Sequence, residues 1–249
     1  MTGLELPDPF MMLTVGAALA VGGVIKGITG AGAPLLAIPV IASFHDIRLA
    51  VAVMILPNIA TNIWQLFQYR SAQPGTGLLL WFPLAGATGA TLGTVALVSI
   101  PPETAQLLLA GIIFLWLGLR LFKPALQLPI PLRDRLVLPV GLTAGMFQGA
   151  VGIAAPVAVT YLSAARLPRP EYIRVVSAFL LSMGVAQMIA QTGLGLMTPD
   201  IALLSVMALV PMSLAMVLGN RIGRRISAAA FDKVIMVFLT VVALRMLFL

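Results

Sequence analysis

The sequence predicts an all-α integral membrane protein, and the prediction rests on composition, an internal duplication and the distribution of charge. Of the 249 residues, 60% are hydrophobic and 9% are charged, and the mean hydropathy is +1.07. This leaves too little polar surface for a water-soluble globule, so we expect the lipid bilayer to surround the chain. We expect eight to ten membrane helices, from apolar runs near 10–28, 49–68, 76–98, 104–122, 136–152, 172–192, 200–219 and 229–248 and shorter pieces at 34–44 and 154–165.

The duplication is visible in a glycine-rich segment that occurs twice. Residues 23–34 read GVIKGITGAGAP, and residues 145–156, 122 positions later, read GMFQGAVGIAAP. Each copy interrupts apolar sequence, which predicts a broken, re-entrant helix hairpin in each half. Beyond the hairpin the offset is about 126, which aligns Gln65 with Gln191 and Gly93 with Gly219. We expect one transport domain over 1–249, with repeat one at about 10–122, a proline-rich linker at about 123–135 and repeat two at about 136–248.

The net charge of +7 would suggest nucleic-acid binding in a soluble protein. Here the basic residues lie in short loops between apolar runs, where they orient the chain in the bilayer, so no nucleic-acid partner is expected. If each glycine-rich break is a hairpin tip, each half makes three crossings, the halves are inverted and both termini lie outside. If each hairpin region crosses the membrane instead, the basic residues divide between the two faces.

The hairpin interpretation gives the stronger charge asymmetry, and we favour it for that reason. It leaves only Arg48 and Arg245 outside. The eleven residues that it places in the cytoplasm are Arg70, Arg120, Lys123, Arg133, Arg135, Arg166, Arg169, Arg174, Arg221, Arg224 and Arg225.

The two breaks are the first candidate binding site. Glycines there let the backbone leave the helix and expose N–H groups at the start of the following half-helix, an arrangement that suits an anion. A lysine inside an apolar run costs about 3 kcal/mol unless it meets an anion, a counter-charge or water. The alternatives are close helix packing through small residues and a shallow tip from which the lysine reaches the interface. The candidate residues are Lys26, Gly27, Thr29, Gly30, Gly32, Gln148, Gly149 and Gly152.

A polar stripe in the next span of each half is the second candidate. Asn58, Thr61, Asn62 and Gln65 follow i, i+3, i+4 and i+7 spacing, so they share one helix face. The corresponding span of the second half carries Gln187 and Gln191. These side chains either line a substrate path or join helices by hydrogen bonds.

The chain offers little for a metal or a cofactor. Cysteine is absent, and His45, the only histidine, stands in a loop expected outside. A metal site needs several convergent ligands, so neither a metal nor a cofactor is expected.

The break of Gly27, Gly30, Gly32 and Pro34, its degenerate second copy, a short basic middle loop and about eight spans in 249 residues together resemble the sulfite exporter TauE/SafE family. The resemblance extends over roughly residues 10–248. It implies transport of a small anionic sulfur or carbon compound, such as sulfite, a sulfonate or sulfoacetate, across the bacterial cytoplasmic membrane. The family's first copy usually carries a denser glycine run, where this chain has Ala31.

We therefore expect a secondary transporter that works by alternating access, with the anion bound between the two breaks. No GxxxxGK[ST] motif is present, so ATP drive is not encoded in the chain. Coupling to a proton or to sodium is left open, as is the oligomeric state, a homodimer included. The alternatives are an anion channel that uses the same hairpins as a filter and an intramembrane enzyme. No carboxylate or histidine lies close to the tips in sequence, so no enzyme is expected.

Overall fold

The computed structural model describes residues 9–122 and 128–222, and within these ranges every regular element is an α-helix. The all-α expectation is therefore confirmed. The last expected span, 229–248, lies outside the described residues, as do the predictions made for Lys123, Arg224, Arg225 and Arg245.

Ten helices lie in the described part of the chain. Their bounds are α1 (Pro9–Thr29), α2 (Ala33–Ala42), α3 (Ile47–Val53), α4 (Ile55–Gln68), α5 (Thr76–Ser99), α6 (Pro102–Phe122), α7 (Ile130–Val151), α8 (Ala155–Ala164), α9 (Arg169–Gly193) and α10 (Pro199–Ile222). Five of these segments are long and apolar enough to cross a membrane, namely α1, the joined α3 and α4, α5, α9 and α10.

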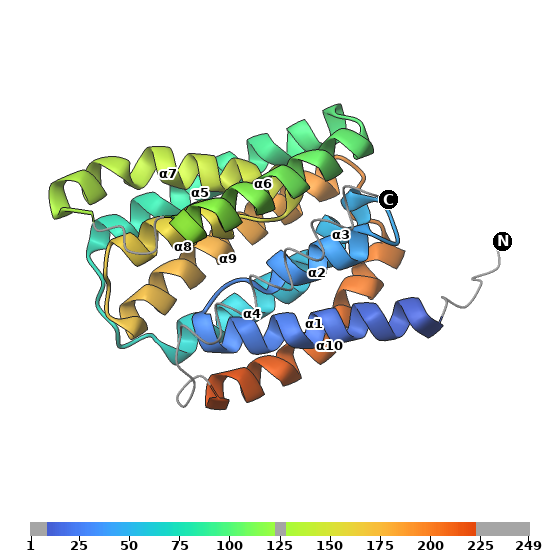
Figure 1. Cartoon of the computed structure of the whole chain (residues 1–249), viewed down its shortest axis with the longest axis horizontal. Coiled ribbons are helices and arrows are strands. Elements are labelled where there is room, and N and C mark those ends of the chain that lie inside the picture. Colours follow the sequence, from blue (N-terminus) through green and yellow to red (C-terminus); the bar gives the residue numbers. More distant parts are fainter. Residues whose placement is uncertain (1–8, 123–127, 223–249) are drawn as a thin grey trace.

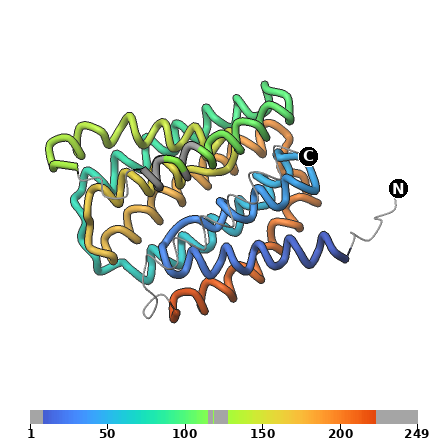
Figure 2. Tube along the Cα trace, in the orientation of Figure 1, coloured from blue at the N-terminus to red at the C-terminus, as the bar shows by residue number. Residues whose placement is uncertain are grey.

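The helices form a bundle built from three pairs. Helix α1 packs against α10, and α5 packs against α7, while α4 and α9 pack against each other between these two pairs. Figures 1 and 2 show α1 and α10 along one edge of the bundle and α5 and α7 along the other. Helix α9 contacts α5 as well as α4, so the inner pair joins the two outer ones.

Glycines allow the outer pairs to approach closely. A Cβ atom added at Gly27 would collide with the backbone of Met216 in α10, and one at Gly149 would collide with the backbone of Ala90 in α5. Small residues permit such approach in membrane bundles, where dispersion contacts favour association. Gly27 and Gly149 therefore lie in helix crossings at the ends of the expected breaks.

The helix breaks occur at the remaining glycines. Gly30 and Gly32 have φ of 85° and 96°, and Gly152 has φ of 77°, values that favour glycine because they crowd a Cβ atom. Helices α2 and α8 then restart, each with a proline in its first turn, where the missing N–H is not needed. The duplicated segment thus interrupts the helix in both halves.

The first hairpin consists of one long helix and one short helix, and not of two half-helices. Helix α1 has 21 residues and α2 has 10, so α1 is long enough to span by itself. The rings of Phe10 and Phe44 lie 6.3 Å apart, which places the start of α1 beside the segment that follows α2. The pair therefore returns to the end of the bundle from which it starts, and the inverted relation of the two halves stays a prediction.

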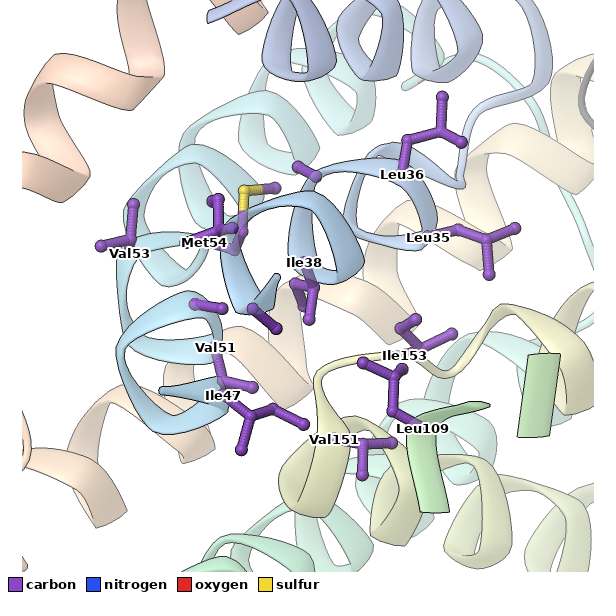
Figure 3. Close-up of a cluster of buried hydrophobic side chains, with 14 of the residues drawn as sticks. Leu35, Leu36, Ile38, Ile47, Val51, Val53, Met54, Leu109, Val151 and Ile153 are labelled. Atoms are coloured by element: carbon purple, nitrogen blue, oxygen red, sulfur yellow. The ribbon is translucent and has the colours of Figure 1, made fainter. Parts of the chain in front are cut away.

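A buried apolar cluster joins the two hairpins. Figure 3 shows Leu35 and Ile38 of α2 in this cluster with Ile153, which follows the second break. A Cβ atom at Gly152 would overlap with the Ile38 side chain. The backbone of the second break therefore lies directly against the first half-helix.

The two halves differ in how they fill corresponding positions. The ring of Phe82, in repeat one, stacks on Phe179 of repeat two at 3.9 Å and lies 5.3 Å from Tyr161. At the offset of 126, the counterparts of Phe82 and Phe179 are Ala208 and Val53, and both border an apolar pocket of about 250 Å³ between α1, α3 and α10. Small side chains thus leave space at one contact between the repeats, where the equivalent contact has aromatic rings.

Candidate functional site

Both helix breaks border one cavity inside the bundle. The first break contributes Ala31 and Gly32, the second contributes Ile153 and Ala154, and α9 closes one side with Leu180. The cavity has a volume of about 10 Å³, room for about one water molecule. The structure therefore brings the two duplicated segments together, in a conformation that is closed to anything larger.

Two half-helices begin at this cavity. Helix α2 starts at Ala33 and α8 at Ala155, and Pro34 and Ala155 both line the cavity. The first N–H groups of a helix have no partner within the helix, and the aligned peptide dipoles place positive potential there. Pro34 and Pro156 carry no N–H, and the N–H groups of Leu35 and Val157 donate to the Gly32 and Ala154 carbonyls. Two helix N-termini, with their positive potential, thus border one small, apolar space.

Gln148 is the one polar side chain among the cavity-lining residues that the structure describes. Its Nε2 donates to Gln187 Oε1 at 3.4 Å, and Gln187 Nε2 donates to the Gln148 carbonyl at 3.2 Å. The two amides therefore join α7 to α9 beside the cavity.

Thr29 closes the first break rather than facing the cavity. Its Oγ1 lies 3.0 Å from the Ile25 carbonyl and 2.7 Å from the Ala31 carbonyl, and it accepts from Ala31 N–H at 3.3 Å. The hydroxyl thus joins Ala31 of the break to the last turn of α1.

Lys26 is fully buried but does not line the cavity. Its Nζ donates to Asn62 Oδ1 at 2.8 Å. Asn62 Nδ2 in turn donates to Asn58 Oδ1 at 2.8 Å, and Asn58 Nδ2 donates to the Leu180 carbonyl at 3.4 Å. Because Leu180 lines the cavity, a row of hydrogen bonds runs from Lys26 to the cavity wall.

Gln65 forms further hydrogen bonds next to Lys26. Its Nε2 donates to the Lys26 carbonyl at 3.1 Å, and its Oε1 accepts from Ser177 Oγ at 3.2 Å. Ser177 was not among the predicted residues. Ser177 lies ten residues before Gln187 and fourteen before Gln191, so all three share one face of α9. This helical spacing is the sequence signal that could have identified Ser177.

Gln191 is the exception in the polar set. Its side chain is fully buried, and neither its Nε2 nor its Oε1 has a hydrogen-bond partner. Thr61, by contrast, is satisfied, because its Oγ1 lies 2.6 Å from the Pro57 carbonyl one turn earlier.

Lys26 is the one ionisable side chain that the structure describes among these buried polar residues. Among the described residues, the ion pair formed is that of Arg133 and Asp134, at 2.8 Å, and no carboxylate pairs with Lys26. In the same part of the chain, no group of three or more His, Cys, Asp or Glu residues is placed to hold a metal ion.

Interrupted helices that meet inside a bundle of spanning length occur in membrane transporters, and the architecture of this chain is of that kind. The chain belongs to the sulfite exporter TauE/SafE family, whose family model matches residues 15–246. Membership places it among membrane transporters of sulfite or related anions. The comparisons found no matching curated protein and no matching solved structure.

Proposed function

We propose that this protein is a secondary transporter that moves a small anionic sulfur or carbon compound across the bacterial cytoplasmic membrane by alternating access. Sulfite, sulfonates and sulfoacetate are the candidate substrates. The observation that carries the proposal is that both helix breaks, each followed by the start of a half-helix, border one cavity. The positive potential of helix N-termini favours an oxyanion.

The closed cavity gives the proposal its mechanism. A space for about one water is too small for a sulfur oxyanion, so the anion enters a conformation in which the two hairpins have separated. The cluster that joins Ile38 and Ile153 is the contact that must open. A carrier alternates between such states, whereas an open channel would need a continuous path.

Lys26 supplies the compensating charge in this mechanism. Its side chain contacts Asn62, and the amide row leads from Asn62 to the cavity wall at Leu180. When an anion enters the widened cavity, the Lys26 side chain exchanges its amide partner for the anion. A buried ammonium gains much from such a partner because water is excluded.

The proposal is tested by thermal stabilisation of the purified protein with sulfite, sulfate, thiosulfate, taurine, sulfoacetate, acetate and chloride. A ligand that binds the folded state raises the unfolding temperature with its concentration. We expect a shift with a sulfur oxyanion or a sulfonate, its loss in Lys26→Gln, and its retention in Arg70→Gln, which removes an exposed cation. Wild-type affinity in Lys26→Gln would refute the counter-charge role.

Flux measurements separate a carrier from a channel. In proteoliposomes we expect saturable uptake of the stabilising anion and counterflow, in which unlabelled anion inside accelerates the entry of labelled anion. Non-saturating, voltage-driven current without counterflow would support a channel instead. No stabilisation and no flux with any anion of the panel would contradict the proposed function.

A further inference from the structure

Lys26 differs from the other charged residues whose side chains the structure describes. Among these, it is the one Lys, Arg, His, Asp or Glu residue that is buried. Its carbonyl accepts two hydrogen bonds, from Gly30 N–H at 2.8 Å and from Gln65 Nε2 at 3.1 Å. The backbone of Lys26 is thus fixed one turn before the first break.

The hydrogen bonds of Lys26 fit an amine better than an ammonium. An ammonium carries three N–H donors and has no acceptor site, and Nζ has one partner in the structure, Asn62 Oδ1 at 2.8 Å. Buried donors without partners are destabilising, and more so when they carry charge. A neutral amine has two N–H groups and a lone pair, so it leaves fewer donors unsatisfied in this position.

The charges around Lys26 point the same way. Helices α2 and α4 carry no titratable side chain, and those of α10 are Asp200 and Arg221, in its first and last turns. Helix α9 contributes Arg169, Glu171, Tyr172 and Arg174 near its start. Arg169 donates to the Ile28 carbonyl at 3.1 Å. The charged side chain that contacts the end of α1, near Lys26, is therefore a cation and not a counter-charge. None of the acidic residues named here pairs with Lys26.

We propose that Lys26 is an uncharged amine in the anion-free protein and takes up one proton as the anion binds, so that anion and proton cross the membrane together. This inference rests on the proposed function. The amine lone pair accepts a proton from water on one side, and the resulting ammonium pairs with the anion. On the other side the anion leaves, and the ammonium returns its proton to water.

Such a cycle avoids an uncompensated charge in the bilayer at every stage. The empty carrier returns with a neutral amine, and the loaded carrier holds an ammonium beside a monovalent anion. Both states escape the cost of a lone buried charge. The corresponding residue of the second half is Gln148, whose amide forms hydrogen bonds but takes up no proton, so the expected ratio is one proton per anion.

The protonation state is measured directly by NMR of the full-length protein labelled with ¹³C- and ¹⁵N-lysine. The chain has three lysines, Lys26, Lys123 and Lys233, and the spectrum of Lys26→Gln identifies the signal that belongs to Lys26. Without anion at pH 7, we expect Lys26 to show amine chemical shifts and the other two to show ammonium shifts. Ammonium shifts for Lys26 in the anion-free protein would overturn the inference and leave an anion carrier intact.

The anion is then added at a concentration that saturates thermal stabilisation, with sulfite as the probe, because its protonated form, hydrogen sulfite, is a monovalent anion. The Lys26 signal should move to ammonium shifts, and an unchanged amine signal in the stabilised protein would overturn the inference. If neither sulfite nor any other anion of the panel stabilises the protein, the proposed function fails, which is a distinct outcome. The amine shifts of the anion-free protein would then stand alone.

A pair of variants separates binding from release of the proton. Lys26→Arg keeps a permanent positive charge, so we expect it to retain anion stabilisation but to lose at least tenfold in uptake rate. Lys26→Gln should lose both. Stabilisation by the anion itself reports that the Arg variant is folded, and wild-type uptake by that variant would contradict proton coupling.

Discussion

At the scale of single residues, the two halves satisfy corresponding amides differently. Gln65 has partners in the Lys26 carbonyl and the Ser177 hydroxyl, whereas Gln191 has none. The residue 126 positions before Ser177 is Val51, which offers no hydroxyl to the second amide. The bundle therefore holds one amide that stabilises it and one whose polar atoms are buried without hydrogen bonds.

Replacing each amide by methionine, which has a similar shape, should have opposite effects. Gln65→Met leaves the Lys26 carbonyl and the Ser177 hydroxyl without this partner, and we expect a loss of about 1–3 kcal/mol in the free energy of unfolding. Gln191→Met removes unpaired buried polar atoms and should be neutral or stabilising. Thermal unfolding in detergent measures both.

A comparable loss in Gln191→Met would show that Gln191 has a partner, such as a water molecule, in the protein in solution. Unchanged stability together with loss of anion transport would instead assign this amide to substrate binding. The two measurements therefore decide between the predicted binding role and simple burial.

At the scale of elements, the distance between paired helices determines whether a glycine is required for their packing. Gly93 of α5 lies against the carbonyl of Met146 in α7, so that no Cβ atom fits between them. Gly16 of α1 has no neighbouring atom within 4 Å of the position of a Cβ. The same residue type thus permits a crossing in one helix and leaves an unfilled surface in another.

Alanine substitutions should distinguish these two situations. Gly93→Ala forces α5 and α7 apart, and we expect it to destabilise the protein by about 1–3 kcal/mol, as overpacked cores do. Gly16→Ala should stabilise by up to about 1 kcal/mol, because alanine favours the helix over glycine. Both are measured by thermal unfolding, and equal effects would contradict the close crossing.

The aromatic contact of Phe82 with Phe179 and the apolar pocket beside Val53 and Ala208 lie at equivalent positions that are filled differently. Phe82→Ala opens a cavity beside Phe179, and we expect a cost of about 3–5 kcal/mol. Ala208→Leu adds apolar volume beside the 250 Å³ pocket and should stabilise by about 0.5–2 kcal/mol. Destabilisation by Ala208→Leu would show that the pocket is already occupied in the protein in the membrane.

At the scale of the whole molecule, the proposed orientation follows from the hairpin and the basic loops. The segment after α2 lies beside the start of α1, and the segment after α4 lies one crossing away. In that second segment Arg174 donates to the carbonyls of Arg70 and Ala72. Two arginine-bearing segments thus meet at one end, which we assign to the cytoplasm by the positive-inside rule.

Labelling of introduced cysteines checks the orientation, since the chain has no cysteine of its own. His45 and Ser71 are both exposed and lie in loops on either side of the α3–α4 span. In intact cells, a membrane-impermeant maleimide should label His45→Cys and spare Ser71→Cys until the cells are permeabilised. The reverse pattern would invert the topology, and labelling of both in intact cells would refute the intervening crossing.

What the sequence determined by itself was the class of fold and the places where helices break. Hydropathy sets which segments enter the bilayer, because each apolar residue contributes locally. The breaks at Gly30, Gly32 and Gly152 were predictable for the same reason, since a left-handed backbone is a property of the residue that adopts it. Family membership followed from the same local pattern.

The tertiary structure alone decided which groups meet. Lys26 faces Asn62, 36 residues away, rather than the cavity, and Gly27 lies in a helix crossing while Gly32 borders the cavity. Hydrogen bonds and close crossings depend on the rotation and separation of helices far apart in sequence, which helical spacing does not fix. Gln191 shows this most plainly, because its sequence counterpart is hydrogen-bonded and it is not.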